Sequence, residues 1–286
     1  MKPKVDNFAV FILSYGRPDN VKTYNKLREQ GYTGDIFIIV DDKDDTYKQY
    51  IDIYGDQVVV FSKDDIADKF DQGNNWNDRR AVVYARNANP QIARDLGVDY
   101  YIQLDDDYSG FYFVFDPERK WQTKKKIADL DSVFAVMAAF IRDTPYRSIA
   151  MAQGGDFIGG GESRYGKSIW LGRKVMNSFV VATDNPMEFV GIINEDVTTY
   201  VIDGTRGILY GTTSYLDLEQ ASTQQQQGGL TDIYLDIGTY VKSFYSLMYS
   251  PSNVRVTSMG TTHRRLHHRV SWSNTTPMIL SEEHKK

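Results

Sequence analysis

Three consecutive aspartates, Asp105, Asp106 and Asp107, follow the mostly apolar run Tyr-Tyr-Ile-Gln-Leu at residues 100–104. Carboxylates this close repel one another unless a cation or hydrogen-bond donors compensate their charge. Mg²⁺ or Mn²⁺ together with a diphosphate suits such a cluster, because these ions take carboxylate and phosphate oxygens together. If the strand continues, Asp105 and Asp107 point the same way. The pattern favours a divalent metal site over its alternative, a solvated turn.

A second acidic run, Asp41-Asp42-Lys43-Asp44-Asp45, follows the apolar segment at residues 36–40. It is not an EF-hand loop, because Thr46 and Asp52 stand where that loop needs glycine and glutamate. Two interpretations remain open. The run is a solvated group of charges, or Asp41 or Asp42 hydrogen-bonds the base or ribose of a nucleotide.

Arginines precede the aspartate cluster along the chain. The spacing of apolar residues predicts a helix over residues 77–96, broken or kinked near Pro90. Arg79 and Arg86 are seven residues apart and therefore share a face of that helix. Arginine suits bidentate contact with phosphate. The alternative is a solvated helix face with ordinary ion pairs.

Another pair of carboxylates, Glu195-Asp196, follows Asn194 after the apolar segment at residues 189–193. Two acids delivered to one point suit a general base. They also suit the start of a helix, because Asn194 is a good N-cap and acids favour the first turn. The two interpretations are compatible, and residue chemistry alone favours the helix start.

A basic tract at residues 262–269, Thr-His-Arg-Arg-Leu-His-His-Arg, contains three of the four histidines. It could supply a metal ligand, a phosphate clamp or a DNA contact. Its alternative is a basic tail.

The elements that must position these residues alternate in type. Apolar runs at residues 8–13, 36–40, 58–61 and 100–104 predict buried strands, with helical segments between them. Such alternation predicts an α/β fold with a mostly parallel sheet flanked by helices, whose ligands lie at the carboxyl ends of the strands. Later segments predict helices over 127–141 and 230–248 and strands over 148–153 and 175–183. No clean boundary appears, so we expect one domain over residues 1–286.

Composition narrows the classes of protein. With 286 residues, 41% of them hydrophobic, the chain can bury a substantial core. The absence of cysteine excludes disulfide scaffolds, thiol chemistry, Fe–S clusters and zinc ribbons. No apolar run is long enough to span a membrane and no signal peptide is visible, so we expect a cytoplasmic protein. A net charge of -5 disfavours a wholly basic nucleic-acid coat protein. The dinucleotide and P-loop glycine motifs are also missing.

The order of these features resembles the GT-A nucleotide-sugar glycosyltransferases over most of the chain. More narrowly, the chain resembles phage enzymes that glycosylate modified cytosine in DNA, of the TET-associated glycosyltransferase type and the T-even β-glucosyl-HMC glucosyltransferase type. The opening Phe-Ala-Val-Phe-Ile-Leu-Ser-Tyr-Gly-Arg-Pro-Asp-Asn at residues 8–20, the Tyr-Ile-Gln-Leu-Asp-Asp-Asp-Tyr segment at residues 101–108 and the compact length carry this narrower resemblance.

The resemblance implies a GT-A fold with a nucleotide-sugar half at residues 1–115 and an acceptor half at 116–286. Asp105 and Asp107 would be the acids of the D-x-D metal motif, with His263 or His267 as a third ligand to Mn²⁺ or Mg²⁺. Asp196, or Glu195, would be the base in an inverting reaction. We expect the remaining contacts to the nucleotide sugar from Ser14, Arg17, Asp41, Asp42, Arg79, Arg86 and Asp106, and contacts to DNA from Arg264, Arg265 and Arg269.

The expected reaction is transfer of a sugar, glucose in the first instance, from a UDP-sugar to hydroxymethylcytosine or its glucosylated form in phage DNA, in the cytoplasm of the host. Three alternatives stay open: a GT-A enzyme acting on a glycan, lipid or protein, a sugar nucleotidyltransferase, and a catalytically silent UDP-sugar-binding module. Whether the anomeric centre is inverted or retained also stays open.

Overall fold

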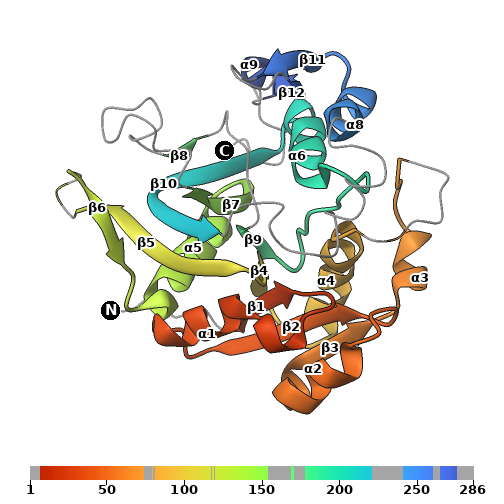
Figure 1. Ribbon diagram of the computed structural model, residues 1–286. Helices are drawn as coiled ribbons and strands as arrows, with labels where there is room; N and C mark the ends of the chain where they lie inside the picture. Colours follow the sequence, from red (N-terminus) through yellow and green to blue (C-terminus); the bar gives the residue numbers. More distant parts are fainter. Residues whose placement is uncertain are drawn as a thin grey trace.

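A computed structural model describes residues 7–73, 79, 81–116, 118, 120–153, 169–170, 178–220, 241–259 and 265–275. A ten-stranded sheet runs through this part of the chain (Figure 1), with the strand order β3-β2-β1-β4-β9-β7-β10-β5-β6 and with β8 paired to β10. The strands are β1 Phe8–Leu13, β2 Asp35–Asp41, β3 Val58–Phe61, β4 Tyr100–Asp105, β5 Tyr108–Phe115, β6 Trp121–Lys126, β7 Tyr146–Gln153, β8 Ile169–Trp170, β9 Ser178–Ala182 and β10 Leu209–Gln220.

Two short 3-10 helices and eight α-helices accompany the sheet in the described residues. They are η1 Pro18–Asn20, α1 Lys22–Glu29, α2 Tyr47–Tyr54, η2 Gly55–Gln57, α3 Lys63–Ala67, α4 Val83–Asp95, α5 Leu130–Asp143, α6 Glu195–Thr205, α8 Lys242–Tyr249 and α9 Trp272–Thr275. A separate two-stranded sheet pairs β11 Val254–Met259 with β12 Arg265–Val270. None of the described helices has both the length and the apolar character that crossing a bilayer requires.

The expectation of a mostly parallel sheet is confirmed in strand direction. Parallel pairing joins β3, β2, β1 and β4, and also β7 and β10. The other pairings are antiparallel, so β5, β8 and β9 run against the remaining seven strands. The antiparallel pairings are concentrated in the half of the sheet beyond β4.

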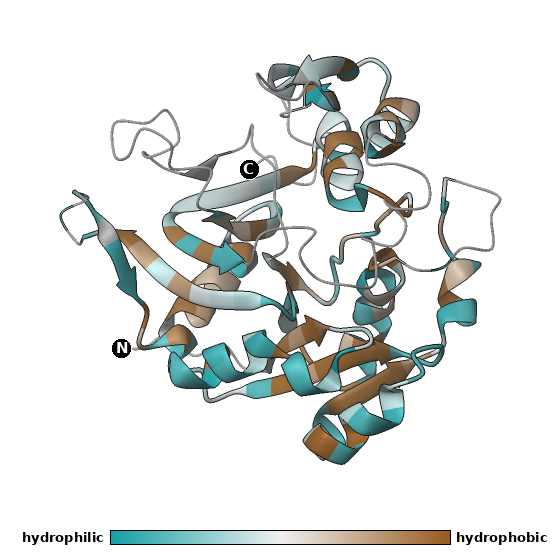
Figure 2. Cartoon of the chain, viewed as in Figure 1, coloured by the Kyte–Doolittle hydropathy of each residue, from teal (hydrophilic) through white to brown (hydrophobic). Residues whose placement is uncertain are grey.

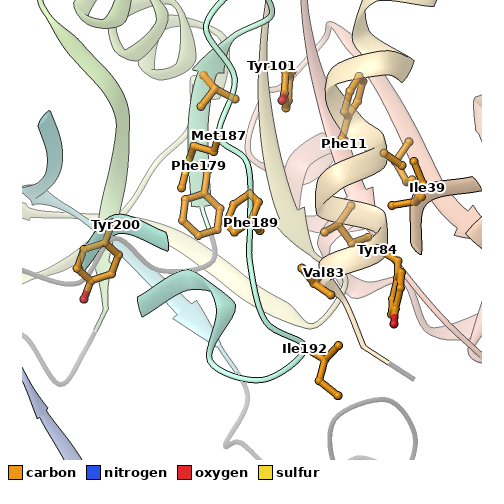
Figure 3. Close-up of a cluster of buried hydrophobic side chains, with 14 of the residues drawn as sticks. Phe11, Ile39, Val83, Tyr84, Tyr101, Phe179, Met187, Phe189, Ile192 and Tyr200 are labelled. Carbon is orange, nitrogen blue, oxygen red and sulfur yellow. The ribbon is translucent and has the colours of Figure 1, made fainter. Parts of the chain in front are cut away.

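Two apolar cores cover the two faces of the sheet, because successive side chains of a strand point to opposite faces. On β1, Phe11 packs into a core with residues of α4 and α6, whereas its neighbours Val10 and Ile12 pack into a core with residues of α1 and α5. Figure 3 shows Phe11, Tyr84, Tyr101, Phe179 and Phe189 gathered in the first of these cores. In Figure 2 the strands β1 and β2 are coloured mostly as hydrophobic residues along their length. This is the pattern expected of strands buried on both sides.

The expected strands 8–13, 36–40, 58–61, 100–104 and 148–153 are confirmed, and the expected strand over 175–183 is β9. The strands β5, β6 and β10 were not predicted. The helix expected over 77–96 begins only at Val83, so Arg79 precedes it and the expected shared face of Arg79 and Arg86 is wrong. Residues 74–78 and 80 lie outside the described residues. Pro90 does lie inside α4.

The helix expected over 230–248 is described only from Lys242, as α8. The apolar spacing behind this prediction puts Val241, Phe244 and Met248 on one buried face, and this is wrong in α8: Phe244 and Met248 are exposed, whereas Ser243 and Ser246 are buried. The physical reason is that α8 packs with Tyr245 in the core beside α6 and with Ser246 Oγ accepting a hydrogen bond from Asn194 Nδ2 at 2.5 Å.

Candidate active site

The carboxyl ends of β1, β2 and β4 meet at one edge of the sheet. Parallel register places Leu13 beside Ile39 on one side and beside Asp105 on the other. The residues that follow these strand ends, Ser14, Asp42 and Asp106, therefore come to the same edge, where α/β sheets bind their ligands. The two acidic runs that follow β2 and β4 therefore begin at the same edge of the sheet.

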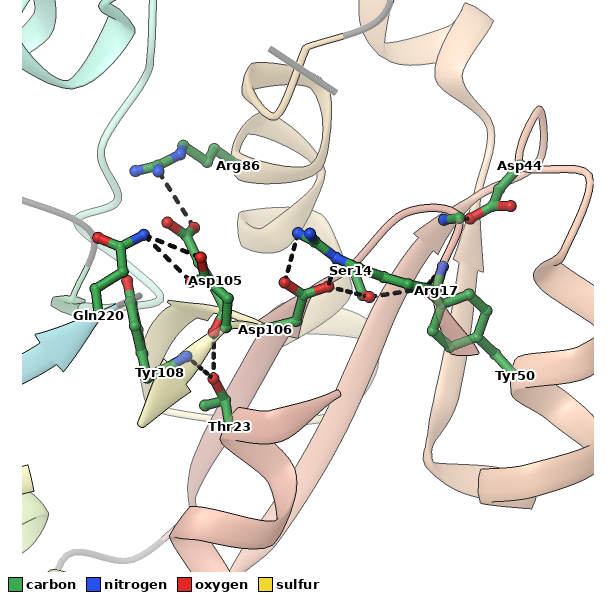
Figure 4. A network of polar contacts seen from close by, with 12 residues as sticks. Ser14, Arg17, Thr23, Asp44, Tyr50, Arg86, Asp105, Asp106, Tyr108 and Gln220 are labelled. Carbon is green, nitrogen blue, oxygen red and sulfur yellow. Dashed lines mark hydrogen bonds and ion pairs between the residues drawn. The ribbon is translucent and has the colours of Figure 1, made fainter. Parts of the chain in front are cut away.

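Asp106 is the centre of a buried hydrogen-bond network (Figure 4). Arg17 contacts its carboxylate through two nitrogens: Nε donates to Oδ2 at 2.7 Å, and Nη2 lies 2.7 Å from Oδ1. Ser14 Oγ also donates to this carboxylate, and it lies 2.7 Å from the hydroxyl of Tyr50. Burial raises the pKa of Asp106, while Arg17 and Ser14 oppose that rise. Asp106 thus fixes the loop after β1 and holds the two predicted donor-site residues, Ser14 and Arg17, in place.

Thr23 of α1 holds the turn that contains the acids. Its Oγ1 donates to the carbonyl oxygen of Asp105 at 2.6 Å and accepts from the backbone N–H of Tyr108 at 2.9 Å. Figure 4 shows these contacts below the carboxylates. The acids therefore sit on a turn that is tied at both ends to the adjoining helix.

Asp105 faces the interior side of the site. Its Oδ1 lies 3.5 Å from Nη2 of Arg86, and Arg86 Nε lies 3.2 Å from Oε1 of Glu195. Burial raises the pKa of Asp105 to about 7; Arg86 opposes the rise, and Asp107, Asp106 and Glu195 add to it. Arg86 is buried and its guanidinium also lies over the ring of Phe179, 4.9 Å from the ring centroid. Arg86 is therefore an internal link between carboxylates rather than an arginine on a solvated face.

Asp107 turns toward β10. Gln220 Nε2 donates to its Oδ1 at 3.2 Å, and Gln153 Nε2 lies 3.4 Å from Gln220 Oε1. Burial raises the pKa of Asp107, and the hydrogen bond from Gln220 opposes this. The strand does not continue through the cluster, because β4 ends at Asp105 and a turn follows. The expected reason for Asp105 and Asp107 pointing the same way is therefore wrong, and each of the three aspartates has a different partner.

At the end of β2, Asp41 pairs with a lysine that was not predicted. Lys63 Nζ lies 2.8 Å from Asp41 Oδ2, and both side chains are buried. The lysine also lies over the ring of Tyr15, 5.1 Å from its centroid. Burial raises the pKa of Asp41, and Lys63 opposes this. Lys63 comes two residues after β3, so the rule that ligands gather at strand ends could have identified it.

The exposed rim beside this pair is lined with ion pairs. Asp42 is exposed and accepts a hydrogen bond from the backbone N–H of Lys63 at 3.0 Å. Arg79 pairs with Asp64, which also lies 3.0 Å from Lys43 Nζ. These contacts match the alternative in which the charges around Asp42 and Arg79 are a solvated group with ordinary ion pairs.

Glu195 and Asp196 begin α6, as the helix-start interpretation predicts, and both are buried. Asn194 stands at the N-cap position in the left-handed conformation, with φ of 59°, but its side chain makes no capping hydrogen bond. Instead it donates to Ser246 of α8. Asn194 therefore occupies the predicted N-cap position, but the prediction that its side chain caps the helix is wrong.

The histidines and arginines predicted to bind metal or DNA, at residues 263–269, come much later in the chain than the acidic residues of the site. His263 and Arg264 lie outside the described residues. Arg265 begins β12, and Arg269 is exposed on the same strand. His267 is partly buried, with its ring centroid 4.4 Å from that of His268.

The residues present fit a divalent ion in their chemistry. Asp105 and Asp107 offer oxygen ligands beside the strand end. Burial raises the pKa of both carboxyls, and a bound cation would favour their charged forms. Within the described ranges no group of three or more histidine, cysteine or acidic side chains is arranged to hold a metal. Two protein carboxylates completed by phosphate oxygens are a common way of holding Mg²⁺.

Solved structures similar to the chain include glucosyl-3-phosphoglycerate synthase from Mycobacterium tuberculosis in complex with Mn²⁺, uridine diphosphate and phosphoglyceric acid (7% identity, 92% of this chain and 87% of that chain, TM-score 0.45). They also include S. aureus TarS 1-349 in complex with UDP (14% identity, 86% of this chain and 66% of that chain, TM-score 0.48). A third is the mannosyltransferase PcManGT from Pyrobaculum calidifontis in complex with GDP-Man and Mn²⁺ (11% identity, 86% of this chain and 74% of that chain, TM-score 0.46).

Among curated proteins, no sequence is significantly similar to this chain. A family profile does match, and it spans residues 8–229, which contain the aspartate cluster, Arg86 and the Glu195-Asp196 pair. A match over most of the chain establishes membership. The chain is a glycosyltransferase and belongs to the TET-Associated Glycosyltransferase family.

Proposed function

We propose that this enzyme transfers a sugar, glucose in the first instance, from a UDP-sugar to hydroxymethylcytosine, or to its glucosylated form, in DNA. The observation that carries the proposal is the bridge by Arg86 between Asp105 of the strand-end cluster and Glu195 of α6. It joins the acids suited to a metal–diphosphate to the acids suited to a base. The modified-cytosine acceptor is supported by the family description and by the resemblance of residues 8–20 and 101–108 to phage enzymes.

In this proposal the donor lies along the carboxyl ends of β1, β2 and β4. Ser14 and Arg17, held by Asp106, line one side, and Asp41 with Lys63 lines the other. The buried Lys63–Asp41 pair would present a fixed carboxylate edge to the ribose or base. Residues 1–115 would then form the donor half and residues 116–286 the acceptor half.

Asp105 and Asp107 would hold Mn²⁺ or Mg²⁺ on the diphosphate. The ion would neutralise the charge that develops on the departing UDP. Gln220 donates a hydrogen bond to Oδ1 of Asp107, which limits the rotation of that carboxylate. Of the two candidate third ligands, His267 does not form a three-residue metal group with these aspartates within the described residues. His263 lies outside those residues and remains part of the proposal.

Asp196 would deprotonate the acceptor hydroxyl in an inverting reaction. Glu195 is less suited to this role, because its carboxylate already pairs with the buried guanidinium of Arg86. The helix N-terminus favours the charged form of an acid in its first turn. In a retaining reaction this pair would position the acceptor instead.

The test is UDP release from UDP-glucose with Mn²⁺, measured with no acceptor, with plain cytosine DNA, with hydroxymethylcytosine DNA and with glucosylated hydroxymethylcytosine DNA. We expect stimulation by modified DNA alone, and the better substrate identifies whether the first or the second sugar is added. Metal-dependent release that no DNA stimulates would move the acceptor to glycans, lipids or proteins. Nucleotide binding without release from any UDP-sugar would instead favour a silent module.

A further inference from the structure

The C-terminal part of this acidic protein has the opposite charge character. Residues 237–281 contain five lysines and arginines and no aspartate or glutamate, although the whole chain has 38 acidic residues and a net charge of -5. Within this stretch, α8, β11, β12 and α9 form a compact group at one end of the molecule (Figure 1). Of the five basic residues, the four in the described part of this stretch belong to α8 and to the two strands β11 and β12.

The two-stranded ribbon of β11 and β12 has an inner and an outer face. Val254 and Val270 are paired and lie in the apolar core. The next pair, Arg255 with Arg269, points to the opposite face because side chains alternate along a strand. Both arginines are exposed. Burial of the valine pair therefore fixes the arginine pair outward.

Like charges directly opposite each other on neighbouring strands destabilise a ribbon. In the part of the chain that the structure describes, neither Arg255 nor Arg269 forms an ion pair with a carboxylate. An anion between the two guanidinium groups would relieve this repulsion. Arginine binds phosphate with two parallel hydrogen bonds, which makes a phosphate chain a suitable ligand.

The ribbon is also tied to the acids of the candidate active site. α8 packs on both strands of the ribbon, and Ser243 Oγ donates to the carbonyl oxygen of Leu266 in β12 at 3.2 Å. One turn further along, α8 meets α6 through Ser246, which contacts Asn194 at 2.5 Å and Thr198 at 3.0 Å. Asn194 immediately precedes Glu195 and Asp196. A polymer held by the ribbon would be held in a fixed relation to that pair.

We infer that the outer face of the β11–β12 ribbon, centred on Arg255 and Arg269, is a backbone clamp for duplex DNA. This deepens the proposed function and rests on it for the choice of DNA among phosphate polymers. A two-stranded ribbon also has dimensions that the major groove of B-form DNA admits. Contacts of this kind position the duplex and carry no sequence information. Arg255 was not among the residues predicted to contact DNA.

The test measures binding of the full-length protein to a fluorescent duplex of about 20 unmodified base pairs, by anisotropy between about 50 and 200 mM salt. The slope of log affinity against log salt is negative. We expect Arg255→Ala and Arg269→Ala each to reduce the magnitude of this slope by about 0.9, the value for one phosphate contact. Arg255→Glu can pair across the strands with Arg269, so it should reduce the magnitude of the slope further while the melting temperature is kept or raised. That variant separates loss of DNA contact from loss of folding.

Arg142→Ala is the matched control, because it removes the same charge from α5, where Arg142 pairs with Asp143. It should keep the wild-type slope. Unchanged slopes in the ribbon variants, no binding by wild type, or equal affinity for duplex RNA would overturn the inference. Slopes that fall in magnitude in the ribbon variants support the clamp even if wild type releases no UDP with any modified DNA. That second result would overturn the proposed acceptor alone.

Discussion

At the scale of single residues, the three consecutive aspartates have different surroundings. Asp106 is buried in contact with Arg17 and Ser14, Asp105 faces Arg86, and Asp107 faces Gln220. Asp106 orients the loop after β1, so it is the least available of the three to an ion. Asp105 and Asp107 remain the pair suited to a metal.

Asp107→Ala should abolish metal-dependent UDP release, with a loss of at least about 100-fold, because even residues that only support a metal ligand often cost 10–100-fold. Folding should be retained, since the side chain of Asp107 is only partly buried. Mn²⁺ binding by calorimetry and a circular dichroism melt check both statements. Wild-type turnover in this variant would contradict the metal assignment.

Asp196→Asn should lose transfer by about 10²- to 10⁴-fold, the usual contribution of a general base. Affinity for the UDP-sugar should be unchanged, because the base acts on the acceptor. Transfer to modified DNA and donor affinity are measured side by side. Unchanged transfer with intact folding would remove Asp196 from the mechanism.

At the scale of elements, Arg86 joins α4 to the end of β4 and to the start of α6. Pro90 lies four residues after Arg86 in the same helix, and proline cannot donate the hydrogen bond that the Arg86 carbonyl would otherwise receive. The helix therefore carries a buried charge and a backbone irregularity in adjacent turns.

Arg86→Met should lower the free energy of unfolding by about 3–5 kcal/mol, because it leaves buried carboxylates without their partner. Adding Glu195→Gln should restore part of the loss, since an amide at residue 195 removes one unpaired charge. Urea denaturation of the two variants gives both values. If the double variant is no more stable than the single one, Glu195 is not the partner that matters.

The contact between α6 and β10 should make stability depend on pH. Tyr210 donates to Asp203 in this contact. Burial raises the pKa of Asp203, and Tyr210 and Arg147 oppose the rise. The folded state thus holds this proton more tightly than the unfolded state. The contribution of Asp203 is fully present below its unfolded pKa of about 4 and is lost as the pH rises through its folded pKa.

Asp203→Asn cannot lose this proton. The stability of that variant relative to wild type should therefore increase as the pH rises from about 4 to 7, by about 1.4 kcal/mol for each unit of pKa difference. Urea denaturation at several pH values measures this difference. A difference that is constant with pH would show that Asp203 titrates alike in both states.

At the scale of the whole molecule, metal and nucleotide should stabilise the fold together. UDP with Mn²⁺ at about 100 times its dissociation constant should add about 2.7 kcal/mol to the free energy of unfolding. Calorimetry should show a raised melting temperature that EDTA removes. An equal rise with UDP and EDTA would mean that the nucleotide binds without the ion.

The sequence predicted the first four strands well, because β1, β2, β3 and β4 are mostly apolar runs, and β2 and β4 end in acids. It did not predict the β5–β6 hairpin or β10. The polar residues Asp217 and Glu219 interrupt the apolar pattern of β10, and Lys124 of β6 pairs with both. Lys63 and Gln220 were missed because their roles depend on partners 22 and 113 residues away, Asp41 and Asp107. Local spacing contains no information on such pairs.

The strand order has a consequence for engineering the protein in pieces. A cut between β5 and β6 would leave one fragment with β3, β2, β1, β4 and β5, and the other with β9, β7, β10, β8 and β6. In the sheet, β9 pairs with β4, and β5 lies between β10 and β6, so each fragment exposes unpaired edges. The two fragments should aggregate when expressed separately and regain activity by complementation when co-expressed. A contiguous cassette that ends at this hairpin therefore cannot be exchanged between relatives without breaking the strand pairs that cross the cut.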